Sequence, residues 1–232
     1  MAGKNCGQGL STGREGSILN YPVIILGAGG HAKVLIDALL LRSVELLGIT
    51  DADAGKKGHT LLGVPVLGGD AEVMKHPAEA IRLVNGVGSV RVNPLRRQLF
   101  EQFAGKGYRF ASVAHPSAII ATDVALSEGT QIMAGAVVQT GCHIGTNALI
   151  NTGSIVDHDC HIGNHAHISP GVTLSGGIRI GENSHIGTGA TVIQGIQIGR
   201  NSLIAAGAVV IRDVPDGVTV AGVPAREIKV TT

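Results

Sequence analysis

The chain has few aromatic residues, little net charge and no long apolar run. Aromatic residues make up 2% of its 232 residues and tryptophan is absent, which suits a core of aliphatic and small side chains. The formal net charge is +1, so there is no electrostatic case for a nucleic acid partner. No run of about 18 apolar residues occurs, so no membrane span is expected. The three cysteines, an odd number, fit a reducing, cytoplasmic setting better than a disulfide framework.

A six-residue repeat fills nearly half of the chain. From Ile120 to Val210, every sixth residue is Ile, Leu or Val, sixteen times without interruption. Two residues before each of them stands a small or β-branched side chain. Cys142 and Cys160 occupy this column, which predicts a structural place for both thiols. A period of six fits neither a helix nor simple strand alternation. It is typical of a parallel β-helix built from hexapeptide turns.

Three hexads make one coil of 18 residues with three flat faces. Residues 18 apart are therefore expected to lie directly above one another, at the strand spacing of about 4.8 Å. One such column contains only glycine: Gly145, Gly163, Gly181 and Gly199. Because glycine tolerates positive φ, we expect positive φ at this corner. Four histidines precede the buried aliphatic residue by one position and are expected to face outward: His143, His161, His167 and His185.

Strands and helices alternate before the repeat. Strands are expected at 21–26, 46–50, 64–67, 81–85 and 108–113, with helices at 32–42, 70–75 and 94–105. We therefore interpret residues 21–112 as a small Rossmann-like βαβ domain, 113–212 as the β-helix and 213–232 as a C-terminal cap. Residues 1–20 have no periodicity and are expected to be a disordered tail or a cloning remnant.

A glycine-rich turn joins the first predicted strand to the first helix. The turn, residues 27–31, reads Gly-Ala-Gly-Gly-His. Glycines there let a phosphate approach the backbone, and the helix N-terminus supplies N–H donors and a positive dipole. Asp51 and Asp53 follow the second strand, where they would meet a base or a ribose. Because the domain is too short for a full dinucleotide fold, we favour a mononucleotide or nucleotide-sugar site. A tight structural turn is the alternative.

Two motifs together resemble one protein family. The repeats end in Ala-Gly-Val-Pro-Ala-Arg at 221–226, which resembles the left-handed β-helix acyltransferases. The stretch Ile-Leu-Gly-Ala-Gly-Gly-His-Ala-Lys-Val at 25–34 resembles the nucleotide-sugar domain of one branch, the bacterial sugar acetyltransferases of the bacillosamine, perosamine and sialic acid pathways. The resemblance covers about residues 21–228. It also implies left-handed winding, which the period alone does not reveal.

The resemblance implies a homotrimer and a shared site. Acetyl-CoA, the co-substrate, would lie in the groove between neighbouring β-helices, while the amino-terminal domain holds a nucleotide-linked sugar. From the residues alone, His158 could equally be a solvated turn histidine. The family implies that it is the general base, that Asp159 raises its basicity, and that His167 and Gly176 contact CoA. The substrate contacts carried over from the family are Ala28, Gly29, Gly30 and Asp51.

We therefore expect an acetyl-CoA-dependent N-acetyltransferase acting on the 4-amino group of a UDP- or GDP-linked amino-dideoxy sugar. O-acetylation of sialic acid or a related sugar is the alternative. Ala52 stands where some relatives carry a second acid, which leaves the nucleotide base open. No metal is expected, because hexapeptide-repeat carbonic anhydrases use two histidines five apart and no pair in the solenoid has that spacing. A non-catalytic nucleotide-sugar sensor would not need the pair of His158 and Asp159.

Overall fold

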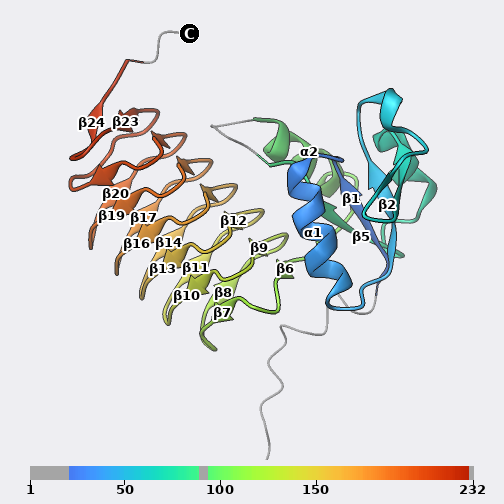
Figure 1. Cartoon of the computed structure of the whole chain (residues 1–232), viewed down its shortest axis with the longest axis horizontal. Coiled ribbons are helices and arrows are strands. Elements are labelled where there is room, and N and C mark those ends of the chain that lie inside the picture. The colour runs from blue at the N-terminus through green and yellow to red at the C-terminus, as the bar shows by residue number, and fades with distance from the viewer. Residues whose placement is uncertain (1–20, 89–93, 230–232) are drawn as a thin grey trace, which may run out of the picture.

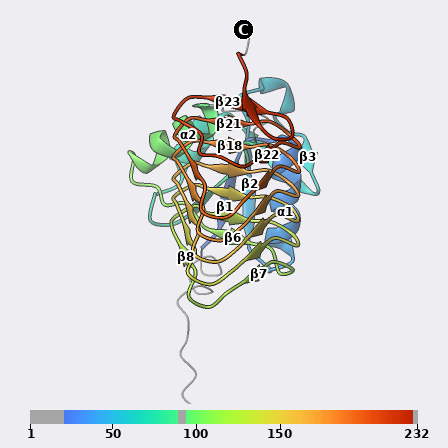
Figure 2. The same cartoon turned by 90° about the vertical axis from the view of Figure 1, so that its left-hand side faces the viewer.

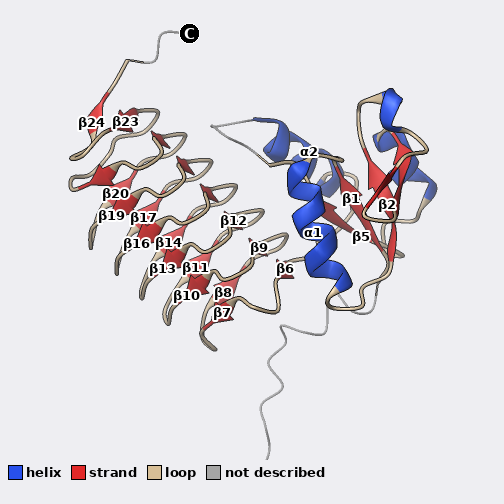
Figure 3. Ribbon diagram, in the orientation of Figure 1, coloured by secondary structure: helices blue, strands red, loops and turns tan. Residues whose placement is uncertain are grey.

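The structure is a computed structural model that describes residues 21–88 and 94–229. An α/β domain at one end continues into a solenoid of stacked strands (Figure 1). Helices occur only in the α/β domain among the described residues (Figure 3). None of them is long and apolar enough to cross a membrane. The expectation for residues 1–20 lies outside the described residues.

The α/β domain is built on a five-stranded sheet in the order β3-β4-β2-β1-β5, parallel except for β3. Its strands are β1 (Val23–Leu26), β2 (Leu46–Thr50), β3 (Thr60–Leu61), β4 (Val64–Gly68) and β5 (Arg82–Asn85). Its helices are α1 (Gly30–Leu40), α2 (Pro94–Ala104) and the 3₁₀ helices η1 (Ala54–Lys56) and η2 (Asp70–Lys75). The predicted helix at 70–75 is therefore of the tighter 3₁₀ kind.

Alternation along β1 divides the core of this domain into two layers. Val23 and Ile25 pack with α1, whereas Ile24 and Leu26 pack with Phe100 and Phe103 of α2. All four β1 side chains are fully buried. This explains why the strand reads as a continuous apolar run, as is usual for a central strand covered on both faces. The phosphate-loop turn consequently lies at the carboxyl end of a rigid, buried strand.

The solenoid is a parallel β-helix whose strands form three sheets. The first sheet contains β7 (Ile119–Ile120), β10 (Val137–Val138), β13 (Ile155–Val156), β16 (Thr173–Leu174), β19 (Thr191–Val192) and β22 (Val209–Val210). The second contains β8 (Ala125–Leu126), β11 (His143–Ile144), β14 (His161–Ile162), β17 (Arg179–Ile180) and β20 (Gln197–Ile198). The third contains β6 (Val113–Ala114), β9 (Gln131–Ile132), β12 (Leu149–Ile150), β15 (His167–Ile168), β18 (His185–Ile186), β21 (Leu203–Ile204), β23 (Thr219–Ala221) and β24 (Arg226–Glu227).

The predicted stacking at 18 residues is confirmed by the strand register. Ile144 pairs with Ile162, which pairs with Ile180, and the same step recurs in all three sheets. Figure 2 shows the coils stacked from β7 and β8 at one end to β23 at the other. Burial of each aliphatic residue in the column stabilises the fold by about 1.5–3 kcal/mol. Both cysteines of the small-residue column are buried free thiols, as expected.

The prediction of positive φ for the glycine column is wrong by two residues. Positive φ occurs at Asn147, Asp159 and His165, and at glycines such as Gly153, but not at Gly145. A Cβ on Gly145 would come within 2.6 Å of the backbone nitrogen of Asn164 in the next coil. The column is therefore glycine because adjacent coils approach closely there, not because of backbone dihedral angles.

The chain passes from the α/β domain to the solenoid without a long final strand. In place of the predicted strand at 108–113, Phe110 forms one isolated bridge to Leu83, and β6 then pairs with β9 of the solenoid. The segment breaks because its hydrogen bonds change partner between the two sheets. The third solenoid sheet faces α1, and Met133 and Leu149 belong to the same apolar core as that helix (Figure 1).

Candidate active site

The phosphate-loop turn leaves space beside its glycines. Gly27 has φ +96° and packs against Val87, where a Cβ would lie 3.0 Å from the Val87 Cγ2. Gly29 precedes the helix and Gly30 is its first residue, and a Cβ on either would meet no heavy atom within 4 Å. Gly27 is thus required by the fold. Gly29 and Gly30 keep open a space that a ligand phosphate can enter at a helix N-terminus.

Asp51 ties this turn to the following loop. Its Oδ2 accepts hydrogen bonds from the Ala28 backbone N–H at 2.7 Å and from the Lys56 ammonium at 2.9 Å, and its Oδ1 accepts the Asp53 N–H at 2.9 Å. Partial burial acts in the opposite direction, but these donors lower the pKa of Asp51. Asp53 is occupied as well, because it caps η1 through the Gly55 N–H at 2.9 Å. Lys56, which sequence reasoning missed, adds a cation at the turn.

A cavity of about 930 Å³ lies between the α/β domain and the third solenoid sheet. Residues 27–31, Asp51 and Lys56 line one side. His167, His185 and the corner residues of neighbouring coils line the other. The structure therefore brings the predicted substrate contacts together with His167, one of the two predicted CoA contacts. A cavity of this size is typical of a site that binds a small ligand or cofactor.

His167 and His185 project from the third sheet but are not solvent-facing, contrary to the prediction. They are 6% and 4% exposed, because the α/β domain covers this face of the solenoid. Their rings pack edge to face with centroids 4.6 Å apart. Burial lowers the pKa of His185 to about 4 and that of His167 well below its usual range. Both are therefore neutral at pH 7, and neither carries charge into the cavity.

His158 lies at the corner between β13 and β14 and has the geometry of a general base. Its Nδ1 is 2.8 Å from the Asp159 Oδ2. Because a carboxylate only accepts hydrogen bonds, Nδ1 carries the proton and Nε2 presents a lone pair. The side chain is 49% exposed, and the hydrogen bond to Asp159 raises the pKa of His158. This is the arrangement that a proton acceptor needs near neutral pH.

Gly176 lies next to His158 in the neighbouring coil. A Cβ on Gly176 would be 2.5 Å from both Cε1 and Nε2 of the imidazole. The glycine therefore leaves the space that the ring occupies. Asp159 has φ +60°, a conformation that its corner position requires and that Asp tolerates better than most residues. The family resemblance implies only a CoA contact for Gly176, and the repeat does not predict its packing against His158.

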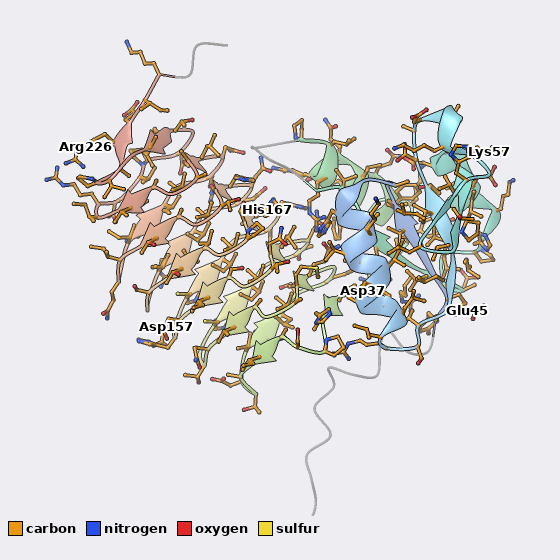
Figure 4. All side chains as sticks on the ribbon, viewed as in Figure 1. Asp37, Glu45, Lys57, Asp157, His167 and Arg226 are labelled. Carbon is orange, nitrogen blue, oxygen red and sulfur yellow. The ribbon has the colours of Figure 1, made fainter. Side chains whose placement is uncertain are left out.

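The predicted site residues form two groups. His158, Asp159 and Gly176 lie at one corner of the solenoid and are not among the residues that line the 930 Å³ cavity. His167 faces that cavity. Figure 4 shows His167 on the side toward α1 and Asp157, the neighbour of His158, at the far edge of the solenoid. Within a single chain, the candidate base and the phosphate-loop turn therefore lie apart.

The two outward-facing histidines of the second sheet, His143 and His161, belong to neither of these groups. The rings of His143 and His161 stack with centroids 4.8 Å apart and an interplanar angle of 9°, beside Arg179 in a groove of about 710 Å³. Within residues 21–88 and 94–229, no cluster of three or more His, Cys, Asp or Glu side chains could hold a metal ion.

Comparison with known proteins matches both parts of the chain. Residues 22–103 match the PglD N-terminal domain, and residues 141–176 and 177–212 match the bacterial transferase hexapeptide repeats. UDP-N-acetylbacillosamine N-acetyltransferase of Bacillus subtilis is 40% identical over 121 residues, 48% of this chain and 51% of the relative. The chain thus spans about half the length of the curated relative it matches.

Solved structures match over nearly the whole chain. PerB from Caulobacter crescentus, in complex with CoA and GDP-perosamine, is 39% identical, with 90% of this chain and 97% of that one covered and a TM-score of 0.83. The acetyltransferase domain of PglB from Neisseria gonorrhoeae, in complex with acetyl coenzyme A, is 37% identical, with coverages of 90% and 100% and a TM-score of 0.83. A perosamine N-acetyltransferase variant with one histidine replaced by asparagine is also 39% identical, with coverages of 90% and 97% and a TM-score of 0.84.

The fold and the two family matches place the chain in the hexapeptide-repeat class of transferases. Within that class, the chain belongs to the bacterial nucleotide-sugar N-acetyltransferases that carry a PglD N-terminal domain. The fold expected from the sequence, a small Rossmann-like βαβ domain followed by a left-handed parallel β-helix, is confirmed.

Proposed function

We propose that this protein transfers the acetyl group of acetyl-CoA to the 4-amino group of a UDP- or GDP-linked amino-dideoxy sugar. The observation that carries the proposal is His158, whose Nδ1–H is held by Asp159 and whose Nε2 is free to accept a proton at an exposed corner. The solved relatives bound to CoA, acetyl-CoA or GDP-perosamine support the substrate classes.

The proposed chemistry is acyl transfer assisted by a general base. The amine nitrogen attacks the thioester carbonyl while His158 Nε2 takes a proton from it. Collapse of the tetrahedral intermediate breaks the carbon–sulfur bond, and the imidazolium gives its proton to the departing thiolate, so that CoA leaves as the free thiol. The Asp159 carboxylate stabilises the imidazolium that forms between these steps and holds the productive tautomer.

We propose that the phosphate-loop turn binds the diphosphate of the sugar nucleotide. Gly29 and Gly30 offer backbone N–H groups and open space, whereas the Ala28 N–H is donated to Asp51 and holds the turn in place. The Lys56 ammonium, paired with the Asp51 carboxylate at 2.9 Å, stands at the same cavity wall. His167 and Gly176 would contact acetyl-CoA, as the family resemblance implies. Both described cysteines are free thiols, which suits an enzyme that works in the cytoplasm.

We propose a homotrimer in which each site is shared between two subunits. The first solenoid sheet carries two exposed apolar side chains that a partner would cover: Ile119 is 66% exposed and Ile155 is 42% exposed. The base corner of one subunit would then meet the cavity of the next, which joins the two groups of residues that one chain separates. Light scattering at micromolar protein concentration should give three times the chain mass, and a stable monomer would contradict the shared site.

A mixture of two inactive variants tests the shared site directly. Gly29→Val removes phosphate access and His158→Ala removes the base, so each homotrimer should be inactive. If the base and the loop come from different subunits, co-refolding or co-expression should restore about a quarter of the wild-type rate, because random assortment pairs the intact groups in one site out of four. No recovery in verified mixed trimers would place both groups in one chain and refute the proposal.

Gly29→Val should weaken binding of the sugar nucleotide by at least about tenfold, because its side chain would enter the space left for the phosphate. Folding should be unaffected, since a Cβ at this position meets no heavy atom within 4 Å and the backbone φ is −95°. Calorimetric titration with UDP, GDP and acetyl-CoA measures the affinity for each of the two kinds of substrate. Equal loss of acetyl-CoA affinity would contradict separate sites for the two substrates.

The function itself is tested by a panel of acceptors with acetyl-CoA. UDP- and GDP-linked 4-amino sugars are expected to yield an N-acetyl product and free CoA, detected by mass spectrometry and thiol titration. A matched 4-hydroxy sugar nucleotide should yield neither. Acetyl transfer to the hydroxyl compounds alone, or to none of the panel, would refute the N-acetyltransferase assignment.

A further inference from the structure

Arg96 is buried where α2, the end of β5 and the solenoid meet. It is 4% exposed. Its Nη1 donates to the carbonyl oxygens of Asn85 at 3.0 Å and Val87 at 2.9 Å, and its Nη2 donates to the Asn147 carbonyl at 3.4 Å. The Asn85 amide returns a hydrogen bond to the Arg96 carbonyl at 2.8 Å. The side chain thus holds the loop after β5, which forms part of the cavity wall.

The charge of Arg96 has no counter-ion among the described residues. Its acceptors are backbone carbonyls, and its Nε is buried without a hydrogen-bond partner. Burial lowers the pKa of Arg96 to about 9, and no acidic group offsets that effect, so it stays charged at pH 7. The adjacent segment 89–93 contains no Asp or Glu that could serve. A buried, unpaired guanidinium is costly, and a neutral donor would bind these carbonyls at lower cost.

The positive charge of Arg96 helps to lower the pKa of two histidines that line the cavity. Burial is the main cause that lowers the pKa of His31 to about 4, and the Arg96 charge adds to it. The same charge contributes to the low pKa of His167. Both histidines line the cavity on opposite sides. His31 Nε2 lies 2.8 Å from the Gln131 Oε1, and the Gln131 amide donates to the Asn85 carbonyl at 2.9 Å. Because Arg96 also donates to that carbonyl, this network links Arg96 to the phosphate-loop turn.

We propose that Arg96 is a positioning residue for the nucleotide sugar, whose diphosphate is the missing counter-ion of the buried guanidinium. This inference rests on the proposed function and deepens it. Arg96 would fix the carbonyls of Asn85 and Val87 at the cavity wall and would place a positive charge behind it. Binding of the diphosphate would then compensate a charge that the described protein residues leave unpaired. The turn at Gly29 and Gly30 contacts the phosphates directly, and Arg96 acts through the field and the loop.

The test compares nucleoside diphosphates with nucleosides on the full-length protein. Titrations of UDP, GDP, uridine and guanosine are made with wild type, Arg96→Met, Arg96→Lys and Arg97→Met. Arg97 is the matched control, because it lies next in α2 but already pairs with Glu101 at 2.7 Å and Glu182 at 2.8 Å. Arg96→Met should weaken the diphosphate by about tenfold or more relative to its nucleoside, and should flatten the salt dependence of binding.

The remaining variants separate charge from packing. Arg96→Lys keeps the charge but loses the fork of donors, so it should retain most of the preference for the diphosphate even if its melting temperature falls as far as that of Arg96→Met. Arg97→Met should keep the wild-type preference. A purely structural role predicts that both Arg96 variants lose nucleoside and diphosphate affinity together, and that result would overturn the inference. So would an unchanged diphosphate preference in Arg96→Met.

A measurement on the unaltered protein covers the case in which the variants do not fold. In ¹⁵N-arginine-labelled wild type, the Arg96 Nε–H signal should shift on addition of UDP or GDP and not on addition of the nucleosides, since only the diphosphate changes its field. No difference between the two ligand classes would refute the inference. If wild type binds neither UDP nor GDP, the proposed function fails as a whole. If wild type binds them and Arg96→Met binds them equally well, only this inference fails.

Discussion

Replacing His158 with alanine is expected to lower kcat by about 10²–10⁴-fold, which is the usual contribution of a general base. Affinity for both substrates should change little, because the imidazole acts on the proton in the transition state and not on the bound ground state. The expectation follows from the Nδ1–H held by the Asp159 carboxylate at 2.8 Å, which leaves Nε2 as the acceptor. Steady-state kinetics with acetyl-CoA and a 4-amino sugar nucleotide measure the loss.

Asp159→Asn should have a smaller effect on kcat and a distinct effect on pH dependence. The hydrogen bond and charge of Asp159 raise the pKa of His158, so the variant lowers it. The neutral, active form of His158 then persists to lower pH, and the acidic limb of the kcat profile moves toward lower pH. Profiles from about pH 5.5 to 9 span the imidazole titration.

His143→Ala is the matched control for these measurements. His143 is also an exposed histidine of the solenoid, but it lies on the second sheet and stacks on His161. The variant should keep wild-type turnover. Turnover of His158→Ala within about threefold of wild type across the whole pH range, well below the usual contribution of a general base, would remove His158 from the mechanism.

Gly176→Ala is expected to lower kcat by about 10- to 100-fold without weakening the fold. The new Cβ would lie 2.5 Å from the His158 Cε1 and Nε2. The imidazole is half exposed and can swing away, so folding absorbs the change at little cost while the base leaves its position. Kinetics and thermal unfolding measured together separate the two effects.

Gly69→Ala is the control for the Gly176 substitution. Gly69 has φ −72°, and a Cβ there meets no heavy atom within 4 Å, so neither activity nor stability should change. A rise in the KM for acetyl-CoA with unchanged kcat in Gly176→Ala would show that Gly176 contributes to CoA binding and does not set the position of His158. A large fall in melting temperature would show that the coil cannot accommodate the Cβ.

Several features of this protein were determined by the sequence alone. The period of six, and the period of 18 above it, predict the β-helix, because an inward aliphatic residue and a small neighbour must recur once per face. The Gly-rich turn between an apolar strand and a helix predicts a phosphate site. The repeat and the turn can both be predicted because each depends on residues that are close together along the chain. The family resemblance added the candidate base, His158, and its neighbour Asp159.

Other features depend on contacts between distant residues, which no local pattern encodes. His167 and His185 have the outward positions of the repeat, yet both are buried because the α/β domain covers that face. The column of Gly145 is set by the backbone of the next coil, 18 residues away. Arg96 reads as one of several polar residues on an amphipathic helix, and only packing of that helix against β5 and the solenoid encloses its charge. The periodicity determined the coils, whereas the tertiary structure decided which of their side chains are buried against the rest of the chain.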